Sequence, residues 1–206
     1  SPRPIFPDWA GWPGAEMESS HTMLATTVQR PGGGEKTIGV VRLALNHDIT
    51  ATPRRVRVNG KAGEWKNTGE ALFLGEFSDA WATVRASQDE RNVYFLVEVS
   101  DTCMTSSDYI RLMLAGLESS ASDALMIKVG ANGEAMAEVA GVKVDAVKAS
   151  SGSEGSLDAE GEDKGWIVEI AVPREALMIK DSQIALNAVL YDASVGREDF
   201  LSEGDS

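Results

Sequence analysis

The feature that most constrains the fold is the run from Asn92 to Ser100, in which apolar side chains recur at every second position. One side of this run carries Val93, Phe95, Val97 and Val99, and the other carries Tyr94, Leu96 and Glu98. A period of two is typical of a β-strand, because successive side chains point to opposite faces of a sheet. A second run has the same period, with Trp166, Val168, Ile170 and Val172 on one side and Glu169 on the other. The sequence therefore predicts strands that each bury an apolar face.

Short apolar runs separated by turn residues continue along most of the chain, which is the pattern of an all-β protein. The runs predict strands at Ile38–Leu45, Arg54–Val58, Trp81–Ala86, Val93–Ser100, Tyr109–Ala115, Ala124–Val129, Ala135–Val139, Val142–Val147, Trp166–Val172 and Ile184–Tyr191. Proline at position 173 favours one short helical turn over Pro173–Leu177, since proline is tolerated at a helix start. The stretch Ala149–Gly165 is rich in Ser, Gly and acidic residues and predicts a long exposed loop. We expect a two-sheet antiparallel β-sandwich, similar to a jelly roll.

Residues 1–36 differ from the rest of the chain, because they hold five of the seven prolines and the run Gly32–Gly34. We interpret them as an irregular lead-in or as the tail of a preceding domain, and we assign the sandwich to residues 37–206. The chain begins Ser1-Pro2-Arg3-Pro4, where we expect no signal peptide. We expect it to be part of a longer protein that is secreted or displayed at the cell surface.

Composition limits the partners that the chain can bind. The net charge is −13 over 206 residues, which argues against nucleic acid and anionic membranes as partners, because both require a cationic surface. An uncharged polymer meets no such penalty. Cys103 is the only cysteine, so the chain has no internal disulfide and no cysteine-rich zinc site.

Catalytic signatures are absent from the sequence. His21 and His47 are the only histidines, and no Gly-x-Ser-x-Gly motif accompanies them. An arranged acid, base or nucleophile is what a hydrolase needs, and no spacing of residues here points to one. We therefore expect a protein that is not an enzyme and that requires no cofactor.

Four segments together resemble family 9 carbohydrate-binding modules. The first runs from Val58 to Trp65 and reads VNGKAGEW, and the second runs from Asp89 to Asp101 and ends a strand in aspartate. The third is Gly165–Pro173, with Trp166 and Glu169, and the fourth is Ile184–Asp192. The resemblance implies a β-sandwich without catalytic activity that binds a polysaccharide or oligosaccharide and accompanies other domains of a secreted polysaccharide-degrading or cell-surface protein.

The sugar-binding residues of that family are only partly matched. The family has a stacking tryptophan before the strand that starts here at Asp108, and another near the C-terminus. In this chain neither Thr102–Ser107 nor Ala193–Phe200 holds a tryptophan, and Arg111 stands where the family usually has glutamate. The alternative is therefore a structural or protein-interaction sandwich that has lost sugar binding. A haem-binding relative is a third interpretation, for which His21 and His47 are poorly placed.

Sugar binding needs an aromatic face to stack on a pyranose ring, with polar groups at its rim. The candidate ligand-binding residues are Tyr109, Arg111, Asp192, Trp9 and Trp12. We interpret Trp65 and Trp166 as core residues and expect Trp81 to be packed as well. The aspartates at strand ends, Asp101 and Asp108 with Asp192, could instead hold a structural calcium ion, which prefers several oxygen ligands.

Overall fold

The computed structural model describes residues 21–24, 28–29, 35–36, 42–45, 50–51, 56–65, 68, 71–75, 80–116, 123–158, 163–177 and 184–200. In the segments up to residue 51, and at residues 197, 199 and 200, it describes the backbone only. The chain divides into two compact units, which we treat separately. The first is Ser1–Asp48 with Ser202–Ser206, and the second is Ile49–Leu201.

In the first unit the described residues form two antiparallel strand pairs. Strand β1 (His21–Leu24) pairs with β4 (Arg42–Leu45), and β2 (Val28–Gln29) pairs with β3 (Glu35–Lys36). The predicted strand Ile38–Leu45 thus corresponds to β4, whose partner is β1. The division predicted after residue 36 stays a prediction.

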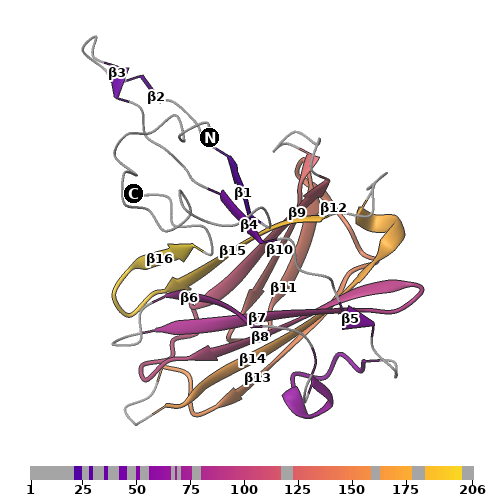
Figure 1. Ribbon diagram of the computed structural model, residues 1–206. Coiled ribbons are helices and arrows are strands. Elements are labelled where there is room, and N and C mark those ends of the chain that lie inside the picture. The colour runs from indigo at the N-terminus through magenta and orange to yellow at the C-terminus, as the bar shows by residue number, and fades with distance from the viewer. Residues whose placement is uncertain are drawn as a thin grey trace. The chain divides into compact units, whose positions relative to one another are not determined.

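The second unit is a β-sandwich of two six-stranded sheets (Figure 1). The first sheet, here called the outer-tyrosine sheet, is antiparallel throughout and has the order β12 (Val142–Lys143), β11 (Ala135–Val139), β10 (Leu125–Gly130), β9 (Tyr109–Gly116), β15 (Ile184–Asp192) and β16 (Arg197–Phe200). The second, the tryptophan sheet, has the order β13 (Lys148–Glu154), β14 (Gly165–Pro173), β8 (Asn92–Ser100), β7 (Trp81–Gln88) and β5 (Thr50–Ala51). Strand β6 (Leu72–Gly75) also pairs with β7. Only β5 runs parallel to its neighbour among these described strands.

The main core lies between the two sheets and follows the predicted alternation. Val93, Phe95, Val97 and Val99 all belong to it, as do Trp166, Val168, Ile170 and Val172. The other sheet contributes alternate residues such as Ile110, Leu112 and Ile127. These assignments confirm the all-β sandwich predicted from the sequence.

A second, smaller core covers the opposite side of β8. Tyr94 and Leu96 pack there against Trp65, Val56 and Ala171. Trp65 ends the 3-10 turn η3 (Ala62–Trp65), so the segment 56–65 crosses the sheet as a cover. Strand β8 is therefore buried on both faces, and the core roles predicted for Trp65 and Trp166 are confirmed, at 2% and 1% exposure.

The predicted helical turn is present as the 3-10 turn η5 (Arg174–Leu177). The loop predicted over Ala149–Gly165 is wrong in its first part, because β13 pairs with β14 from Lys148 to Glu154. Residues 56–58 are not a strand, and the strand predicted over Val142–Val147 ends at Lys143. Strands β6 and β16 were not predicted.

Candidate functional site: three buried aspartates beside a tyrosine pair

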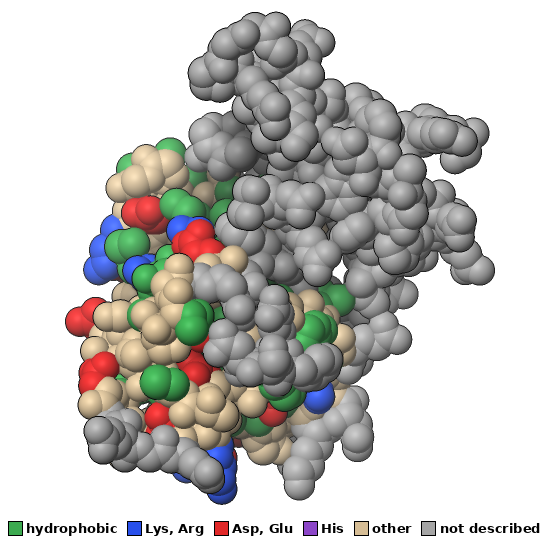
Figure 2. All heavy atoms as spheres, turned by 90° about the vertical axis from the view of Figure 1, so that its left-hand side faces the viewer, with side chains coloured by type: hydrophobic (Ala, Val, Ile, Leu, Met, Phe, Trp, Pro, Cys, Tyr) green, Lys and Arg blue, Asp and Glu red, His purple; other side chains and the backbone are tan. Residues whose placement is uncertain are grey.

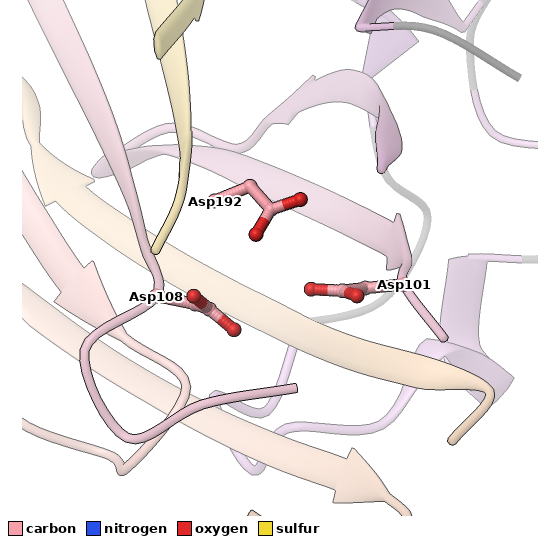
Figure 3. A group of neighbouring side chains, drawn as sticks. All are labelled: Asp101, Asp108 and Asp192. Atoms are coloured by element: carbon pink, nitrogen blue, oxygen red, sulfur yellow. The ribbon is translucent and has the colours of Figure 1, made fainter. Parts of the chain in front are cut away.

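Three aspartates meet at one end of the sandwich. Asp101 directly follows β8, Asp108 directly precedes β9, and Asp192 is the last residue of β15. A carboxylate oxygen from each lies within 4.8 Å of the others, and the three side chains point toward one another (Figure 3). All three residues are buried, with exposures of 4%, 1% and 1%. The group therefore joins the tryptophan sheet, through β8, to the outer-tyrosine sheet.

Each carboxylate also closes a local turn. Asp108 accepts hydrogen bonds from Thr105 N (2.6 Å), Thr105 Oγ1 (2.8 Å) and Ala193 N (2.9 Å). Asp192 Oδ1 accepts from Ser194 N (2.8 Å) and Ser194 Oγ (2.6 Å), and Asp101 Oδ1 accepts from Cys103 N (2.8 Å). Asp192 Oδ2, in contrast, is buried without a hydrogen-bond partner among the described residues.

This arrangement suits a hard divalent cation. Buried carboxylates so close together repel one another strongly in a medium of low dielectric constant. A calcium ion would offset that repulsion, since it takes six to eight oxygen ligands that include aspartate carboxylates. It would also satisfy Asp192 Oδ2. From the sequence, Asp192 was a candidate both for ligand binding and, with Asp101 and Asp108, for a calcium site, and the structure brings these three carboxylates together.

The loop that carries Asp101 and Asp108 is held from outside by a second segment. Asp163 Oδ2 accepts a hydrogen bond from Met104 N (3.1 Å), and Asp158 Oδ1 accepts one from Ser106 N (2.9 Å). The hydrogen bonds from Ser106 lower the pKa of Asp158. Asp163 is only 7% exposed, although it lies in the stretch Ala149–Gly165 that was predicted to be an exposed loop. The carboxylates of Asp158 and Asp163 therefore hold the loop 102–107 in place.

A pair of tyrosines lies on the outward face of the same strand ends. Tyr109 and Tyr191 are direct partners across β9 and β15, and their rings stack with centroids 4.8 Å apart at 23°. Because side chains alternate along a strand, the neighbours Asp108 and Asp192 point inward while the two tyrosines point outward. The candidate cation site and the tyrosine pair thus lie on opposite faces of the outer-tyrosine sheet, at the same ends of β9 and β15.

Polar and charged groups surround Tyr109. Its hydroxyl donates a hydrogen bond to Glu198 Oε1 (2.7 Å), and Arg111 Nη2 lies 3.5 Å from the same oxygen. Lys128 Nζ lies 3.9 Å from the centre of the Tyr109 ring, a cation–π contact. Burial raises the pKa of Tyr109, and the hydrogen bond to Glu198 raises it further.

Neither face of the Tyr109 ring is an open platform. Strands β10 and β15 flank β9 on opposite sides, so Lys128 and Tyr191 approach the ring from opposite sides. Tyr109 therefore offers its edge and its hydroxyl, together with the neighbouring Arg111, and not a wide aromatic face.

The other aromatic candidates divide into two groups. Trp9 and Trp12 lie outside the described residues, so their ligand-binding role stays a prediction. Trp81 is partly exposed and stacks on Phe73, with centroids 5.7 Å apart at 28°.

Sequence reasoning missed Tyr191, Lys128 and Glu198 as members of the group around Tyr109. One signal for Tyr191 is present in the sequence, because Asp108-Tyr109 and Tyr191-Asp192 mirror each other at two strand ends. The contacts of Lys128 and Glu198 with Tyr109 depend on the register between strands, which no local sequence pattern specifies here.

No protein-family model matches this chain, and no curated protein matches it by sequence. Solved structures do match it by fold. One is a carbohydrate-binding module of family 9 from Caldicellulosiruptor kristjanssonii in complex with cellotriose, and another is a family 9 module from the same organism in complex with glucose. Each is 16% identical to this chain with a TM-score of 0.56, and the match covers 74% of this chain and 81% and 83% of the two modules. The chain therefore has a fold like that of family 9 carbohydrate-binding modules, as its motifs indicated.

Within the described residues, no helix is both long enough and apolar enough to cross a membrane.

Proposed function

We propose that this chain is a non-catalytic carbohydrate-binding module of a larger secreted or cell-surface protein. The main observation behind the proposal is the group of polar and aromatic side chains around Tyr109 on the outward face of the outer-tyrosine sheet. The solved family 9 modules of similar fold are complexes with cellotriose and glucose. Such a module raises the local concentration of a tethered catalytic domain at its substrate.

The chemistry of that group suits sugar hydroxyls. Arg111 and Lys128 supply donors and Glu198 supplies an acceptor. Lys128 and Glu198 contact Tyr109, and Arg111 pairs with Glu198. A carbohydrate rim consists of hydroxyls that both donate and accept, so a mixed set of charged groups can bind it in several directions. The Tyr109 and Tyr191 edges would contact the apolar C–H face of the sugar ring.

We assign Asp101, Asp108 and Asp192 to a structural calcium ion in this proposal. The unpartnered Asp192 Oδ2 and the burial of three close carboxylates support the assignment. The ion would hold the start of β9 and the end of β15 together, and so keep the two tyrosines in register.

Affinity electrophoresis through gels that contain a soluble β-glucan or xylan tests the proposal. The wild-type chain should be retarded by at least one polysaccharide, and Arg111→Ala should migrate faster than wild type in that gel. Lys164→Ala, which removes an exposed cation outside this group, is the matched control and should migrate as wild type does. Unretarded migration of the wild-type chain in every gel would contradict the proposal.

A second candidate function is a structural or protein-interaction sandwich that has lost sugar binding. The specific observation in its favour is that both faces of the Tyr109 ring are covered by neighbouring side chains. The same gels decide between the two, because a structural sandwich binds none of the polysaccharides.

A further inference from the structure

We propose that the chain has a second sugar-binding surface on the outward face of the tryptophan sheet, with Phe73 and Trp81 as its stacking platform. The inference rests on the proposed function, since it takes a carbohydrate as the ligand, but it places the aromatic contact on the sheet opposite to Tyr109. The ligand class is a neutral β-linked glucan, whose pyranose rings have flat C–H faces.

Strand register explains why the two rings lie together on the outside. In the pairing of β6 with β7, Leu74 lies opposite Ala82, and both side chains enter the main core. By alternation Phe73 and Trp81 point away from the core, on adjacent strands. Phe73 is 40% exposed, whereas its neighbour Leu74 is 2% exposed. The pair is therefore an outward aromatic surface and not a part of the core.

Polar groups continue from the aromatic pair across the sheet. Thr83 lies opposite Phe73 on one side and opposite Glu98 on the other. The side chains of Arg85 and Glu98 are 31% and 39% exposed. A row of hydroxyl, carboxylate and guanidinium groups thus borders the rings.

The Arg85–Glu98 pair retains hydrogen-bonding capacity. Arg85 Nη2 lies 4.0 Å from Glu98 Oε2, which is beyond hydrogen-bond length. Arg85 Nε, moreover, is buried without a hydrogen-bond partner among the described residues. A ligand hydroxyl that bridges the guanidinium and the carboxylate would complete this pair. Because the two charges cancel, the surface favours a neutral sugar over an acidic one.

The two surfaces differ in what they can offer a ligand. At the first, the Tyr109 ring is flanked by Lys128 and Tyr191, so its contribution is mainly polar. At the second, an exposed aromatic side chain lies beside groups that hydrogen-bond, which is the combination that a pyranose ring requires. This surface would replace the stacking tryptophans that the segments 102–107 and 193–200 lack.

Tryptophan fluorescence of the full chain during titration with cellotriose tests the inference. Trp65 and Trp166 are buried, so the part of a saturable change that belongs to Trp81 is identified by its loss in Trp81→Phe. We expect Trp81→Ala and Glu98→Ala each to raise the dissociation constant at least tenfold. Circular dichroism would reveal a folding defect in Trp81→Ala. Glu98→Ala leaves Phe73 and Trp81 unchanged, so it tests the surface even if Trp81→Ala does not fold. Val142→Ala, which changes an exposed apolar side chain outside both surfaces, is the control and should bind cellotriose as wild type does, with the Trp81 signal in place.

The outcomes separate this inference from the proposed function. If cellotriose binds and Trp81→Phe and Glu98→Ala behave as wild type, the second surface is refuted while carbohydrate binding stands. If wild type binds no sugar in this titration or in the polysaccharide gels, both proposals fall. Self-association that Trp81→Ala abolishes, without any response to sugar, would show an interface between copies and would also overturn the inference.

Discussion

Glu169 is buried in the tryptophan sheet with 0% exposure, yet it is fully used as an acceptor. Its Oε1 accepts from Trp65 Nε1 (2.9 Å), and its Oε2 accepts from Asn59 N (2.7 Å) and Lys61 N (3.3 Å). Strand β14 thereby fixes the segment 56–65, which covers the second core. Glu169, which the sequence pattern placed opposite the apolar face of its strand, therefore holds segment 56–65 against the sheet.

We predict that Glu169→Ala lowers the free energy of unfolding by about 2–4 kcal/mol, because it leaves buried donors without partners. Chemical denaturation followed by tryptophan fluorescence measures the change. Glu175→Ala is the control, since Glu175 is exposed, and should stay within about 0.5 kcal/mol of wild type. An equal loss in both variants would refute the anchoring role.

The raised pKa of Tyr109 leads to a prediction about pH. Burial, and then the hydrogen bond to Glu198, raise the pKa of Tyr109, so the folded chain favours the neutral phenol. The linked contribution to stability is fully present below the ordinary tyrosine pKa of 10.0 and is lost as pH rises through the folded value. In absorbance titration at alkaline pH, one tyrosine should therefore ionise later than an unperturbed tyrosine, and Tyr109→Phe should remove that late step. Its persistence in Tyr109→Phe would assign it to another residue.

The residue scale also shows what sequence can and cannot predict. Trp166 and the alternating residues of β8 were placed correctly, because a period of two directly determines which face a side chain occupies. Trp65 was also placed correctly, but on its position in the family-like motif, since it lies in a 3-10 turn. The contacts of Tyr109 with Lys128 and Glu198 were not predictable, since they depend on which residues face each other across strands distant in sequence.

At the scale of elements, β13 shows how tertiary pairing overrides local pattern. Its sequence KASSGSE has little strand propensity, and the chain forms a strand there because β14 offers a paired edge. The 3-10 turn at Arg174–Leu177 was predictable for the opposite reason, because Pro173 biases the backbone locally.

Close packing at Gly152 of β13 gives a prediction for this element. A Cβ atom at position 152 would lie 2.6 Å from the carbonyl oxygen of Gly60, so the two backbones approach where only glycine fits. We predict that Gly152→Ala costs about 1–3 kcal/mol of unfolding free energy in thermal or chemical denaturation.

Gly63→Ala is the matched control, because a Cβ atom there meets nothing within 4 Å. That variant should lose no stability. A Gly152→Ala variant as stable as wild type would show that the approach of segment 56–65 to β13 is not as close as described.

At the scale of the whole molecule, the three aspartates bring the two sheets together, since Asp101 follows β8, Asp108 precedes β9 and Asp192 ends β15. We predict that calcium stabilises the chain, by about 2.7 kcal/mol when free calcium is 100 times its dissociation constant. Calorimetric melting with calcium and with a chelator measures this shift.

Asp192→Asn should remove most of the calcium-dependent shift, because it takes away one of the three charges that face the ion. Asp145→Asn changes an exposed aspartate elsewhere and should keep the shift. Identical melting of wild type with calcium and with the chelator would argue against an ion in this site.

The sandwich as a whole was predictable because strand periodicity and the four motifs point to the same architecture. The order of strands in each sheet was not predictable, and neither was the burial of Asp101, Asp108 and Asp192, although their places at strand ends had already suggested them together as calcium ligands. Both depend on long-range register. That is why the fold could be proposed from sequence while the site required the structure.

The most direct test of the central claim, that this chain binds carbohydrate, is isothermal titration calorimetry of the full chain with cellotriose in the presence of calcium. The account predicts a saturable heat of binding, which should weaken in Arg111→Ala. The absence of heat from cellotriose, and from xylan and other neutral oligosaccharides under the same conditions, would contradict it and would favour a structural sandwich.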